Sequence, residues 1–353
     1  MAQAMSYTYN IYIMSTILSI KSKSDIFVGR IHEGIDKFLR GERVIVITDA
    51  NIDRLYHSIV GRYEHIIVGH GEGNKNLVTV QNVYQRLMDM GADRSTTLLG
   101  IGGGIVTDIT GYVASTFMRG VDFGFISTSL LGQVDASIGG KNGVNVAHYK
   151  NMVGTFAQPR FVISDVELLK TLPERELRAG MAEVIKMAIV GDSELFDYVE
   201  ENFTEESYAQ SDIMQRIVLD SARLKADIVD RDECERGLRR VLNLGHTVGH
   251  AIEKCSRQFN HGEAVAIGLS QIAQLSHRLG MLSMEERDRI EALLRRVGFD
   301  LNMPVPMADV MREMRYDKKR SNDILRVVLI EKIGCCKIVE MPLKELERYF
   351  ISE

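Results

Sequence analysis

The stretch TTLLGIGGGIVTD (Thr96–Asp108) joins an apolar, β-like run directly to a glycine-rich turn and the start of a predicted helix. Three consecutive glycines, Gly102–Gly104, leave backbone N–H groups and the positive end of the helix open to an anion. The stretch departs from the usual dinucleotide fingerprint, because Ile105 stands where a third glycine would fall. It therefore predicts either an anion-binding turn or a close contact between a strand and a helix.

Similar apolar runs that end in Gly, Asp, Ser or Thr recur on both sides of this stretch. They are RVIVITD (Arg43–Asp49), HIIVGHG (His65–Gly71) and GFISTSLL (Gly124–Leu131), with helical patterns such as residues 76–93 between them. Buried strands that alternate with helices predict a parallel sheet with helices on both faces. Ligands gather at the carboxyl ends of such strands, so TDAN (Thr48–Asn51) and HGEGNK (His70–Lys75) join the glycine turn as a predicted nucleotide site.

The pattern changes after FVISDVELLKTLPERE (Phe161–Glu176). Pro173 suits the first turn of a helix, and from there to about residue 300 the pattern is almost entirely helical. We therefore predict a Rossmann-like α/β domain over residues 1–172 and a mainly α-helical domain over residues 173–353. The tail ILRVVLIEKIGCCKIVEM (Ile324–Met341) predicts a short hairpin.

The composition is that of an ordinary globular protein, with 45% hydrophobic and 26% charged residues among 353. A net charge of −5 argues against a general nucleic-acid binder. The four cysteines form no CxxC pair, which favours a reduced, cytoplasmic setting. The apolar run Ile11–Ile20 is too short to span a membrane, and residues 1–10 are expected to form an unstructured leader.

The segment QVDASIGGKNGVNVAHYKNMVG (Gln133–Gly154) is unusually rich in Lys, Asn and Gly for a loop. Its glycines are positions at which the backbone can approach a partner closely. Lysine and asparagine spaced in this way suit a phosphorylated or polyhydroxylated substrate, although an exposed flexible loop has a similar composition. The polar side chains concerned are Asp135, Lys141, Asn142, Asn145, Lys150 and Asn151.

Three of the nine histidines fall within LNLGHTVGHAIEKCSRQFNHGEAVAIG (Leu242–Gly268). Steps of three and four residues place one polar stripe on a single helical face. The stripe comprises Arg239, Asn243, His246, His250 and Glu253. Such a stripe is usually the solvated face of a surface helix, but Arg, Asn and His beside glycines also suit a ligand site. The zinc-protease motif HExxH is absent, because Thr247 occupies the glutamate position.

A carboxylate and an amine lie three residues apart, at Glu183 and Lys186, on the otherwise apolar helix predicted for RAGMAEVIKMAIV (Arg178–Val190). A buried carboxylate requires a partner. An intrahelical ion pair is one solution. The other is a divalent metal that Glu183 binds together with histidines of the Leu242–Gly268 stretch, since Glu and His are suitable ligands for zinc.

Taken together, six motifs of this chain resemble those of the 3-dehydroquinate synthases, members of the sugar-phosphate cyclase family. In order, they are GGGIVTDITGYVASTFMRG, TSLLGQVDASIGGKNGVN, KNMVGTFAQP, LPERELRAGMAEVIK, LNLGHTVGHAIE and HGEAVAIG. The resemblance implies a lyase that converts 3-deoxy-arabino-heptulosonate 7-phosphate to 3-dehydroquinate in the shikimate pathway of aromatic amino acid biosynthesis. The implied steps are transient oxidation by NAD, phosphate elimination, re-reduction, ring opening and intramolecular aldol closure.

The resemblance also implies roles for individual residues. A divalent metal, Zn or Co, is expected on Glu183, His246 and His261, which leaves room for substrate oxygens and frees His250 to meet the phosphate. The implied substrate contacts are Asp135, Lys141, Asn151, Lys186, Lys225, Arg239, Asn243, His250 and Lys319, the last preferred to Lys318. The implied NAD contacts are Asp49, Asn51, Glu72, Lys75, Gly103, Gly104, Asp108, Thr128, Ser129, Lys141, Lys150 and Thr171.

Two further implications concern a partner subunit and the NAD turn. Arg119 is expected to reach the active site of a second copy, which implies a homodimer. Thr107 stands where the family commonly has a glycine beside the NAD pyrophosphate, and a threonine there adds a hydroxyl contact or narrows the turn.

Three alternatives compete with this interpretation. A metal- and NAD-dependent polyol or alcohol dehydrogenase shares the fold, but such enzymes typically begin their metal site with Asp, often followed by His four residues later. This chain has Glu183 and Met187 at those positions. Another sugar-phosphate cyclase, making an aminated or non-carboxylated ring, is disfavoured because Lys225, Arg239 and Asn243 suit a carboxylated substrate. A non-catalytic relative is expected to have lost a metal ligand or a lysine, and none is missing.

Overall fold

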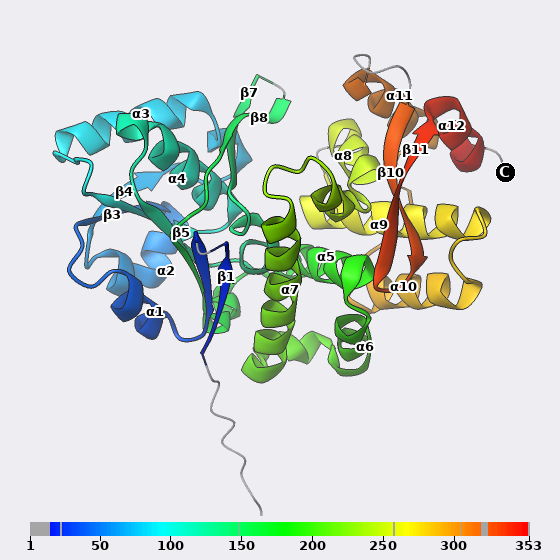
Figure 1. Cartoon of the computed structure of the whole chain (residues 1–353), viewed down its shortest axis with the longest axis horizontal. Helices are drawn as coiled ribbons and strands as arrows, with labels where there is room; N and C mark the ends of the chain where they lie inside the picture. Colours follow the sequence, from blue (N-terminus) through cyan, green and yellow to red (C-terminus); the bar gives the residue numbers. More distant parts are fainter. Residues whose placement is uncertain are drawn as a thin grey trace, which may run out of the picture.

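The computed structural model describes residues 15–21, 23–147, 149–256, 258–303, 305–318 and 324–351. An α/β part and a largely helical part pack side by side, the first blue to cyan-green and the second green to red (Figure 1). This arrangement confirms the predicted fold class. The expected leader at residues 1–10 lies outside the described residues.

A seven-stranded sheet forms the centre of the α/β part. Its strands are β1 (Thr16–Ile20), β2 (Ser24–Val28), β3 (Val44–Asp49), β4 (Glu64–Val68), β5 (Thr97–Gly102), β6 (Phe123–Ser127) and β9 (Phe161–Ser164). They lie in the order β1-β2-β9-β6-β5-β3-β4, with β1 antiparallel to β2 and all other neighbours parallel. The predicted apolar runs fall on β3 to β6, which confirms the parallel sheet.

Helices cover both faces of this sheet, as predicted. Those of the first half are α1 (Ile31–Phe38), α2 (Ala50–Val60), α3 (Leu77–Asp89) and α4 (Gly104–Thr116). Alternate side chains of β3 join different apolar clusters: Val46 packs in the cluster that includes α1 and α2, and Ile47 in the cluster that includes α3 and α4. The strands are therefore buried on both sides, which explains their uninterrupted apolar sequence.

Between β6 and β9 the chain leaves the sheet. It forms the π-helical turn η3 (Gly132–Ala136) and then a hairpin of β7 (Lys141–Val146) and β8 (Tyr149–Phe156). The prediction of a loop over this segment is therefore wrong. Part of its glycine content serves strand pairing, because a Cβ on Gly154 would lie 2.4 Å from the carbonyl oxygen of Asn142.

The second part is built from helices and one hairpin. The helices are α5 (Glu174–Gly191), α6 (Ser193–Asn202), α7 (Ser211–Arg231), α8 (His246–Cys255), α9 (His261–Arg278), α10 (Met284–Arg296), α11 (Met307–Lys318) and α12 (Leu343–Ile351). The short turns of the chain are η1 (Glu72–Asn74), η2 (Phe117–Arg119), η4 (Val166–Thr171), η5 (Glu205–Ala209) and η6 (Leu238–Asn243). The predicted tail hairpin is confirmed as β10 (Ile324–Lys332) and β11 (Cys335–Pro342). Among the described residues, no helix is both long and apolar enough to cross a membrane.

The polar stripe predicted as one helical face is divided between two elements. η6 ends at Asn243, and α8 begins at His246 after Gly245, whose φ of 76° is left-handed. The prediction that a single element presents these side chains is therefore wrong. A Cβ on Gly245 would lie 3.0 Å from atoms of Leu269, so the glycine lets the start of α8 pack closely against α9.

Candidate active site

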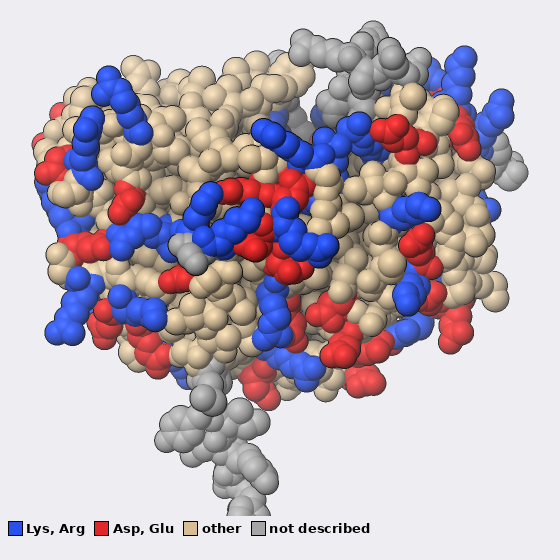
Figure 2. All heavy atoms as spheres, in the orientation of Figure 1, with Lys and Arg blue, Asp and Glu red and all other residues tan. Residues whose placement is uncertain are grey.

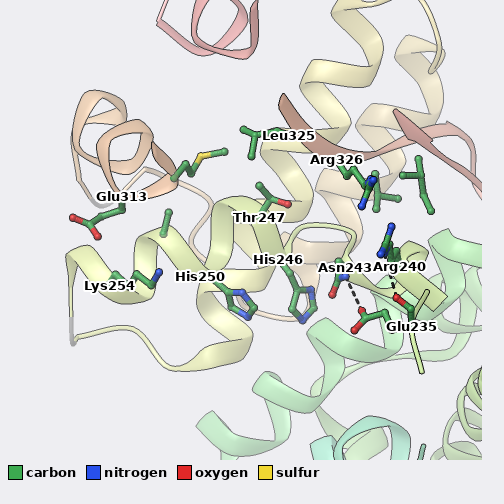
Figure 3. A pocket seen from close by; sticks show the side chains of 14 residues that line it. Glu235, Arg240, Asn243, His246, Thr247, His250, Lys254, Glu313, Leu325 and Arg326 are labelled. Carbon is green, nitrogen blue, oxygen red and sulfur yellow. Dashed lines mark hydrogen bonds between the residues drawn. The ribbon is translucent and has the colours of Figure 1, made fainter. Parts of the chain in front are cut away.

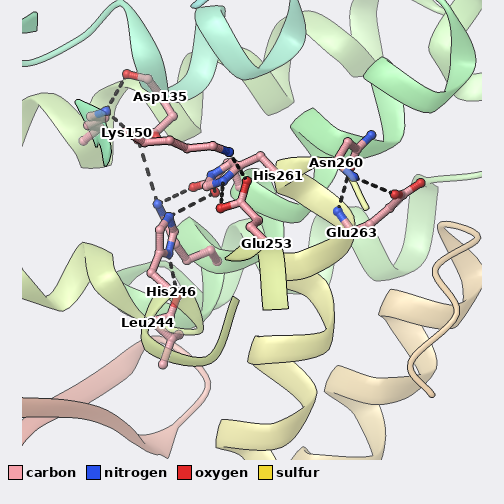
Figure 4. A network of polar contacts seen from close by, with 11 residues as sticks. Asp135, Lys150, Leu244, His246, Glu253, Asn260, His261 and Glu263 are labelled. Carbon is pink, nitrogen blue, oxygen red and sulfur yellow. Dashed lines mark hydrogen bonds and ion pairs between the residues drawn. The ribbon is translucent and has the colours of Figure 1, made fainter. Parts of the chain in front are cut away.

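One carboxylate and two imidazoles converge between α5, α8 and α9. Glu183 Oε1 lies 3.3 Å from His261 Nε2 and 3.5 Å from His246 Nε2. The Glu183 side chain is fully buried, and the candidate ligand atoms of the three residues lie within 4.8 Å of one another. Figure 4 shows the two imidazoles approaching each other from the starts of their helices. The structure thus brings together the three residues that the resemblance names as metal ligands.

Close helix packing sets this geometry. His261 is the first residue of α9, and the side chain of Asn260 caps that helix. A Cβ on Gly262 would lie 2.2 Å from the Cα of Ala179 in α5, so α9 meets α5 backbone to backbone. That contact brings His261 to the middle of α5, where Glu183 lies.

The imidazole of His246 is held in one orientation. Its Nδ1 lies 3.0 Å from the carbonyl oxygen of Leu244. A proton on Nδ1 donates to that oxygen and leaves the Nε2 lone pair directed toward Glu183. Burial lowers the pKa of His246 to about 3, despite the opposing charge of Glu183. The ring is therefore neutral at pH 7, as a metal ligand must be.

The donor set fits a divalent cation. Among the described residues, Glu183 has charged neighbours but no regular hydrogen bond to either carboxylate oxygen, although a buried carboxylate normally requires partners. Its charge is met by an ion pair with Lys186 and by His261. Burial lowers the pKa of His261, but the carboxylates of Glu183 and Glu253 raise it to about 10. A metal ion that binds Nε2 must therefore displace a proton from this ring. One carboxylate and two imidazole nitrogens, with a side left for substrate, are the ligand types of a catalytic zinc or cobalt site.

Further buried charges lie directly beside this group. Asp135, in η3, forms an ion pair with Lys225 of α7, and Lys186 Nζ lies 3.9 Å from the same carboxylate oxygen. Burial raises the pKa of Asp135, but the two ammonium groups outweigh it and lower the pKa below its usual value. Burial also lowers the pKa of Lys225 to about 8. An anionic substrate group placed here stabilises the charged form of both lysines.

A second polar group lies on the segment between α7 and α8. Arg239 is 2% exposed, and its Nε has no hydrogen-bond partner among the described residues. Asn243 Nδ2 donates to Glu235 Oε1 at 2.9 Å, and Lys141 forms an ion pair with Glu235 Oε2. Glu235 thus contacts two of the expected substrate-binding residues, although its position in the sequence did not predict such a role. Its only signal was its place in the charged run DECERGLRR (residues 232–240).

His250 lies one helical turn after His246 and lines a cavity of about 450 Å³ (Figure 3). The cavity extends from Asn243, His246 and His250 toward Arg326 of β10. The ring centroid of His250 lies 5.2 Å from that of His246, so its ring stands beside the Glu183 group. An imidazole in this place can donate a hydrogen bond to a phosphate bound in the cavity.

The glycine turn after β5 is shaped for an anion. Gly103 is the N-cap of α4, and no side chain caps the helix, so the first N–H groups are available to a ligand. A Cβ on Gly103 would lie 3.2 Å from Ser129 Oγ, and one on Gly104 would lie 3.3 Å from Ala136. Thr107 is buried and donates its hydroxyl to the Gly104 carbonyl at 3.0 Å. The Thr107 hydroxyl therefore donates its hydrogen bond to the backbone of α4 itself.

A polar network joins this turn to the hairpin of β7 and β8. The ammonium of Lys75 forms an ion pair with Asp108 of α4 and lies 2.6 Å from Asn151 Oδ1. Burial raises the pKa of Asp108 to about 6, although Lys75 acts to lower it. Asn145 Nδ2 donates to Glu72 Oε1 at 2.8 Å. Expected NAD contacts and an expected substrate contact thus share one network.

Other expected NAD contacts lie along the carboxyl edge of the sheet. Asp49 caps α2, and its Oδ1 accepts a hydrogen bond from the Asn51 N–H at 2.8 Å. Thr171 Oγ1 lies 2.5 Å from the hydroxyl of Tyr56. The N–H of Thr128, which follows β6, donates to the Gly102 carbonyl at 3.0 Å.

Of the remaining expected residues, the structure describes Arg119 and Lys150. Arg119 is exposed beyond the far end of α4, about 20 Å along the helix from the glycine turn. Lys150 forms an ion pair with Glu253 of α8 at 2.9 Å. Lys319 lies outside the described residues. Figure 2 shows Lys, Arg, Asp and Glu side chains gathered on the surface over the junction of the two parts.

Known proteins resemble the chain in sequence and in structure. Family profiles described as 3-dehydroquinate synthase N-terminal and 3-dehydroquinate synthase C-terminal match residues 65–179 and 180–320. The 3-dehydroquinate synthase of Acidithiobacillus ferrooxidans is 42% identical over 311 residues, which cover 85% of each chain. One similar solved structure is the 2-epi-5-epi-valiolone synthase of Streptomyces hygroscopicus subsp. jinggangensis with NAD+ and Zn2+ bound. Its TM-score is 0.85 at 26% identity, and the match covers 96% of this chain and 98% of that one. A 2-deoxy-scyllo-inosose synthase shares the fold, with a TM-score of 0.84 and 21% identity, covering 95% and 99%.

Proposed function

The chain belongs to the 3-dehydroquinate synthase family, and we infer that it converts 3-deoxy-arabino-heptulosonate 7-phosphate to 3-dehydroquinate and phosphate. This reaction makes it a phosphorus–oxygen lyase of the shikimate pathway. The observation that carries the inference is the Glu183 group. In a chain 42% identical to such an enzyme, a buried carboxylate faces two imidazoles beside two buried lysines.

We propose that Glu183, His246 and His261 hold a divalent ion, zinc or cobalt. The donor set and the Zn2+ bound to the valiolone synthase support this assignment. A bound ion of this kind supplies Lewis acidity that makes a coordinated hydroxyl easier to oxidise. Burial keeps His246 neutral, and the Leu244 carbonyl fixes the orientation of its ring.

We propose that the acid group of the substrate meets Lys225, Arg239 and Asn243, next to Lys186 and Asp135. Both lysines and Arg239 are buried, and the guanidinium retains an unpartnered Nε. A bound carboxylate stabilises buried cations of this kind, because its charge offsets part of the free-energy cost of their desolvation. Their positions would hold the keto acid in one orientation, which lowers the entropic part of the barrier.

We propose that the phosphate meets Lys141, Asn151 and His250, which approach from the hairpin and from α8. The position of Lys319, the fourth expected contact, is outside the described residues. In the present arrangement Glu235 pairs with Lys141, so a substrate oxygen must replace that carboxylate. The ion pair holds the lysine side chain in place before the substrate arrives.

We propose that NAD lies along the carboxyl edge of the sheet, with its diphosphate at the glycine turn. The uncapped N-terminus of α4 and the NAD+ bound to the valiolone synthase support this placement. The proposed contacts are Asp49, Asn51, Glu72, Lys75, Gly103, Gly104, Asp108, Thr128, Ser129, Lys141, Lys150 and Thr171. We also propose a domain boundary at residue 172, just before α5, and a cytoplasmic location, which suits four free cysteines.

Two alternative functions fit the site less well. A polyol dehydrogenase acting on a neutral alcohol would leave Lys186, Lys225 and Arg239 buried around the site without an anionic ligand. Met187, where such enzymes often carry a histidine, is buried in the core. Another cyclase that makes a non-carboxylated ring would leave Lys225 and Arg239 without the carboxylate that they suit.

Metal removal tests the proposed function. The purified protein, supplied with NAD, is expected to release inorganic phosphate from the heptulosonate phosphate. Because the proposed chemistry needs a Lewis acid, dialysis against a chelator should lower the rate at least about 100-fold, and zinc or cobalt should restore it. Phosphate release is measured with and without NAD. Turnover that survives complete metal removal would contradict the proposed metal site.

We propose that the protein acts as a homodimer in which Arg119 enters the site of the second subunit. Arg119 and Met118 both have positive φ angles, 70° and 49°, at an exposed turn. The exposed apolar side chains of Met118, Met152 and Phe156 mark η2 and β8 as a surface that a second copy can cover. The hydroxyls of Ser115 and Thr155, 2.8 Å apart, link the last turn of α4, which precedes η2, to β8.

Mixing two inactive variants tests this proposal. Arg119→Ala and Glu183→Gln should each be inactive alone, because each removes one part of every site. After random subunit exchange, about a quarter of the sites combine an intact Glu183 with Arg119 of the partner subunit. Phosphate release by the mixture should therefore recover to about a quarter of the wild-type rate. No recovery would place Arg119 in the site of its own subunit.

A further inference from the structure

Glu253 is a buried acid of α8 to which neither the proposed metal group nor the proposed substrate contacts give a role. Its side chain is 8% exposed and lies between an imidazole of α9 and an ammonium of β8 (Figure 4). Glu253 Oε2 lies 3.5 Å from His261 Nδ1, and Glu253 Oε1 lies 2.9 Å from Lys150 Nζ. The acid therefore joins a proposed metal ligand to the hairpin of the α/β part.

The two nitrogens of His261 face different carboxylates. Nε2 lies 3.3 Å from Glu183 Oε1, on the proposed metal side, while Nδ1 faces Glu253. A neutral imidazole has one N–H and one lone pair, so it can bind an ion through Nε2 only with its proton on Nδ1. A carboxylate at Nδ1 fixes that tautomer and the direction of the ring. The Leu244 carbonyl occupies the same place at His246.

We propose that Glu253 is a positioning residue for the metal centre, accepting a hydrogen bond from His261 Nδ1 and holding Nε2 of that ring toward the ion. The inference rests on the proposed function, because it needs an ion bound by Glu183, His246 and His261. It adds an anionic partner outside the ligand set, which makes the coordinated imidazole a stronger donor.

Lys150 supplies the countercharge to Glu253. His250, Glu253 and His261 also have ligand atoms within 4.8 Å of one another, so this second group by itself could hold an ion. The Lys150 ammonium, 2.9 Å from the Glu253 carboxylate, occupies the place of that second cation. One ion per chain is therefore expected. Because Lys150 belongs to β8, the same ion pair links the hairpin to the metal centre across the junction of the two parts.

The test measures metal binding by the full chain. Zinc affinity is determined by competition with a chromophoric chelator, and the visible spectrum of the cobalt-loaded protein reports ligand geometry. Loss of a hydrogen-bond partner behind a ligand typically weakens metal binding 10–100-fold. We therefore expect the zinc Kd to rise by about 10–100-fold in Glu253→Ala, with a changed cobalt spectrum. The rise should be smaller in Glu253→Gln, whose amide oxygen can still accept the hydrogen bond from Nδ1. Unchanged affinity and superimposable spectra would overturn the proposal.

Two control variants separate positioning from packing. Glu263→Gln removes a carboxylate of α9 that pairs with Arg175. This variant should lower thermal stability while leaving the zinc Kd and the cobalt spectrum unchanged. Lys150→Met should bind the first zinc with a Kd within about threefold of the wild type, because Glu253 keeps its contact with His261. A second zinc bound by Lys150→Met but not by the wild type would support the role of the ammonium, and two zinc ions bound by the wild type would overturn it. A wild-type protein that binds no zinc overturns the proposed function, whereas equal binding by wild type and Glu253→Ala overturns the positioning role alone.

Discussion

Glu183→Gln is expected to lose the metal and to lower kcat/KM at least about a thousandfold. Glu183 is the only anionic member of the group that it forms with His246 and His261, and an amide oxygen is a much weaker ligand. Structural zinc sites gain roughly 10–16 kcal/mol from four ligands, so one ligand accounts for roughly 3–4 kcal/mol, or about 10²–10³ in affinity. Zinc content after dialysis and phosphate release are the two measurements.

The same substitution has a second consequence, for stability. Glu183 forms an ion pair with Lys186, and both side chains are buried. Removing one partner of a buried pair costs about 3–5 kcal/mol, because the other charge stays buried. Asp135 Oδ1 remains 3.9 Å from Lys186 Nζ, so we expect a loss at the lower end of that range. Urea unfolding measures the change in the free energy of unfolding.

A double variant separates the two effects of Glu183→Gln. Glu183→Gln with Lys186→Met removes both charges, so it should regain most of the lost stability and still bind no metal. This outcome would show that metal loss in the single variant is not a result of unfolding. If Glu183→Gln retains one zinc per chain, Glu183 is not a ligand and the proposed site is wrong.

The parts of the site that follow strand ends were predictable from the sequence, because they depend on local patterns. The run into Gly102–Gly104 predicted both β5 and the start of α4, and Asp49 falls at the end of β3 as expected. In parallel sheets the carboxyl ends of neighbouring strands share one edge. Strand assignment alone therefore placed most of the expected NAD contacts on one side of the molecule.

The parts that failed depend on contacts between distant segments. Gly245 interrupts the polar stripe with a left-handed φ because its neighbours in space are backbone and side-chain atoms of Leu269. Nothing local distinguishes this glycine from one tolerated inside a helix. Gly154 likewise looks like a loop residue until the Asn142 carbonyl on the paired strand is known. In both cases the glycine serves close packing, which the sequence does not reveal.

The role proposed for Glu253 was hidden for a related reason. Helical spacing put Glu253 on the same stripe as His246 and His250, which is the usual pattern of a solvated face. Its partners, His261 and Lys150, come from α9 and β8. The Lys150 contact joins residues 103 positions apart, so only the packed structure distinguishes a surface acid from one placed behind a metal ligand.

The two histidines of α8 are expected to respond differently to alanine. His246 Nε2 lies 3.5 Å from Glu183 Oε1, so His246→Ala removes a proposed ligand and should weaken zinc binding roughly 10²–10³-fold, with loss of turnover. His250 lines the cavity and stands outside the Glu183 group. His250→Ala should keep the zinc Kd within about threefold and lower kcat/KM by about 10–100-fold, the effect of losing one hydrogen bond to a charged phosphate.

Zinc affinity and inhibition by inorganic phosphate together distinguish these roles. If His250 contacts the phosphate, the inhibition constant of free phosphate should be higher for His250→Ala than for the wild type. The increase should be similar in size to the loss in kcat/KM. His246→Ala, once zinc is lost, lacks turnover altogether, so its phosphate binding is measured directly by calorimetry and should stay close to that of the wild type without metal. Equal zinc loss in both variants would instead make His250 a ligand. His250 would then join Glu183, His246 and His261 in the ligand set.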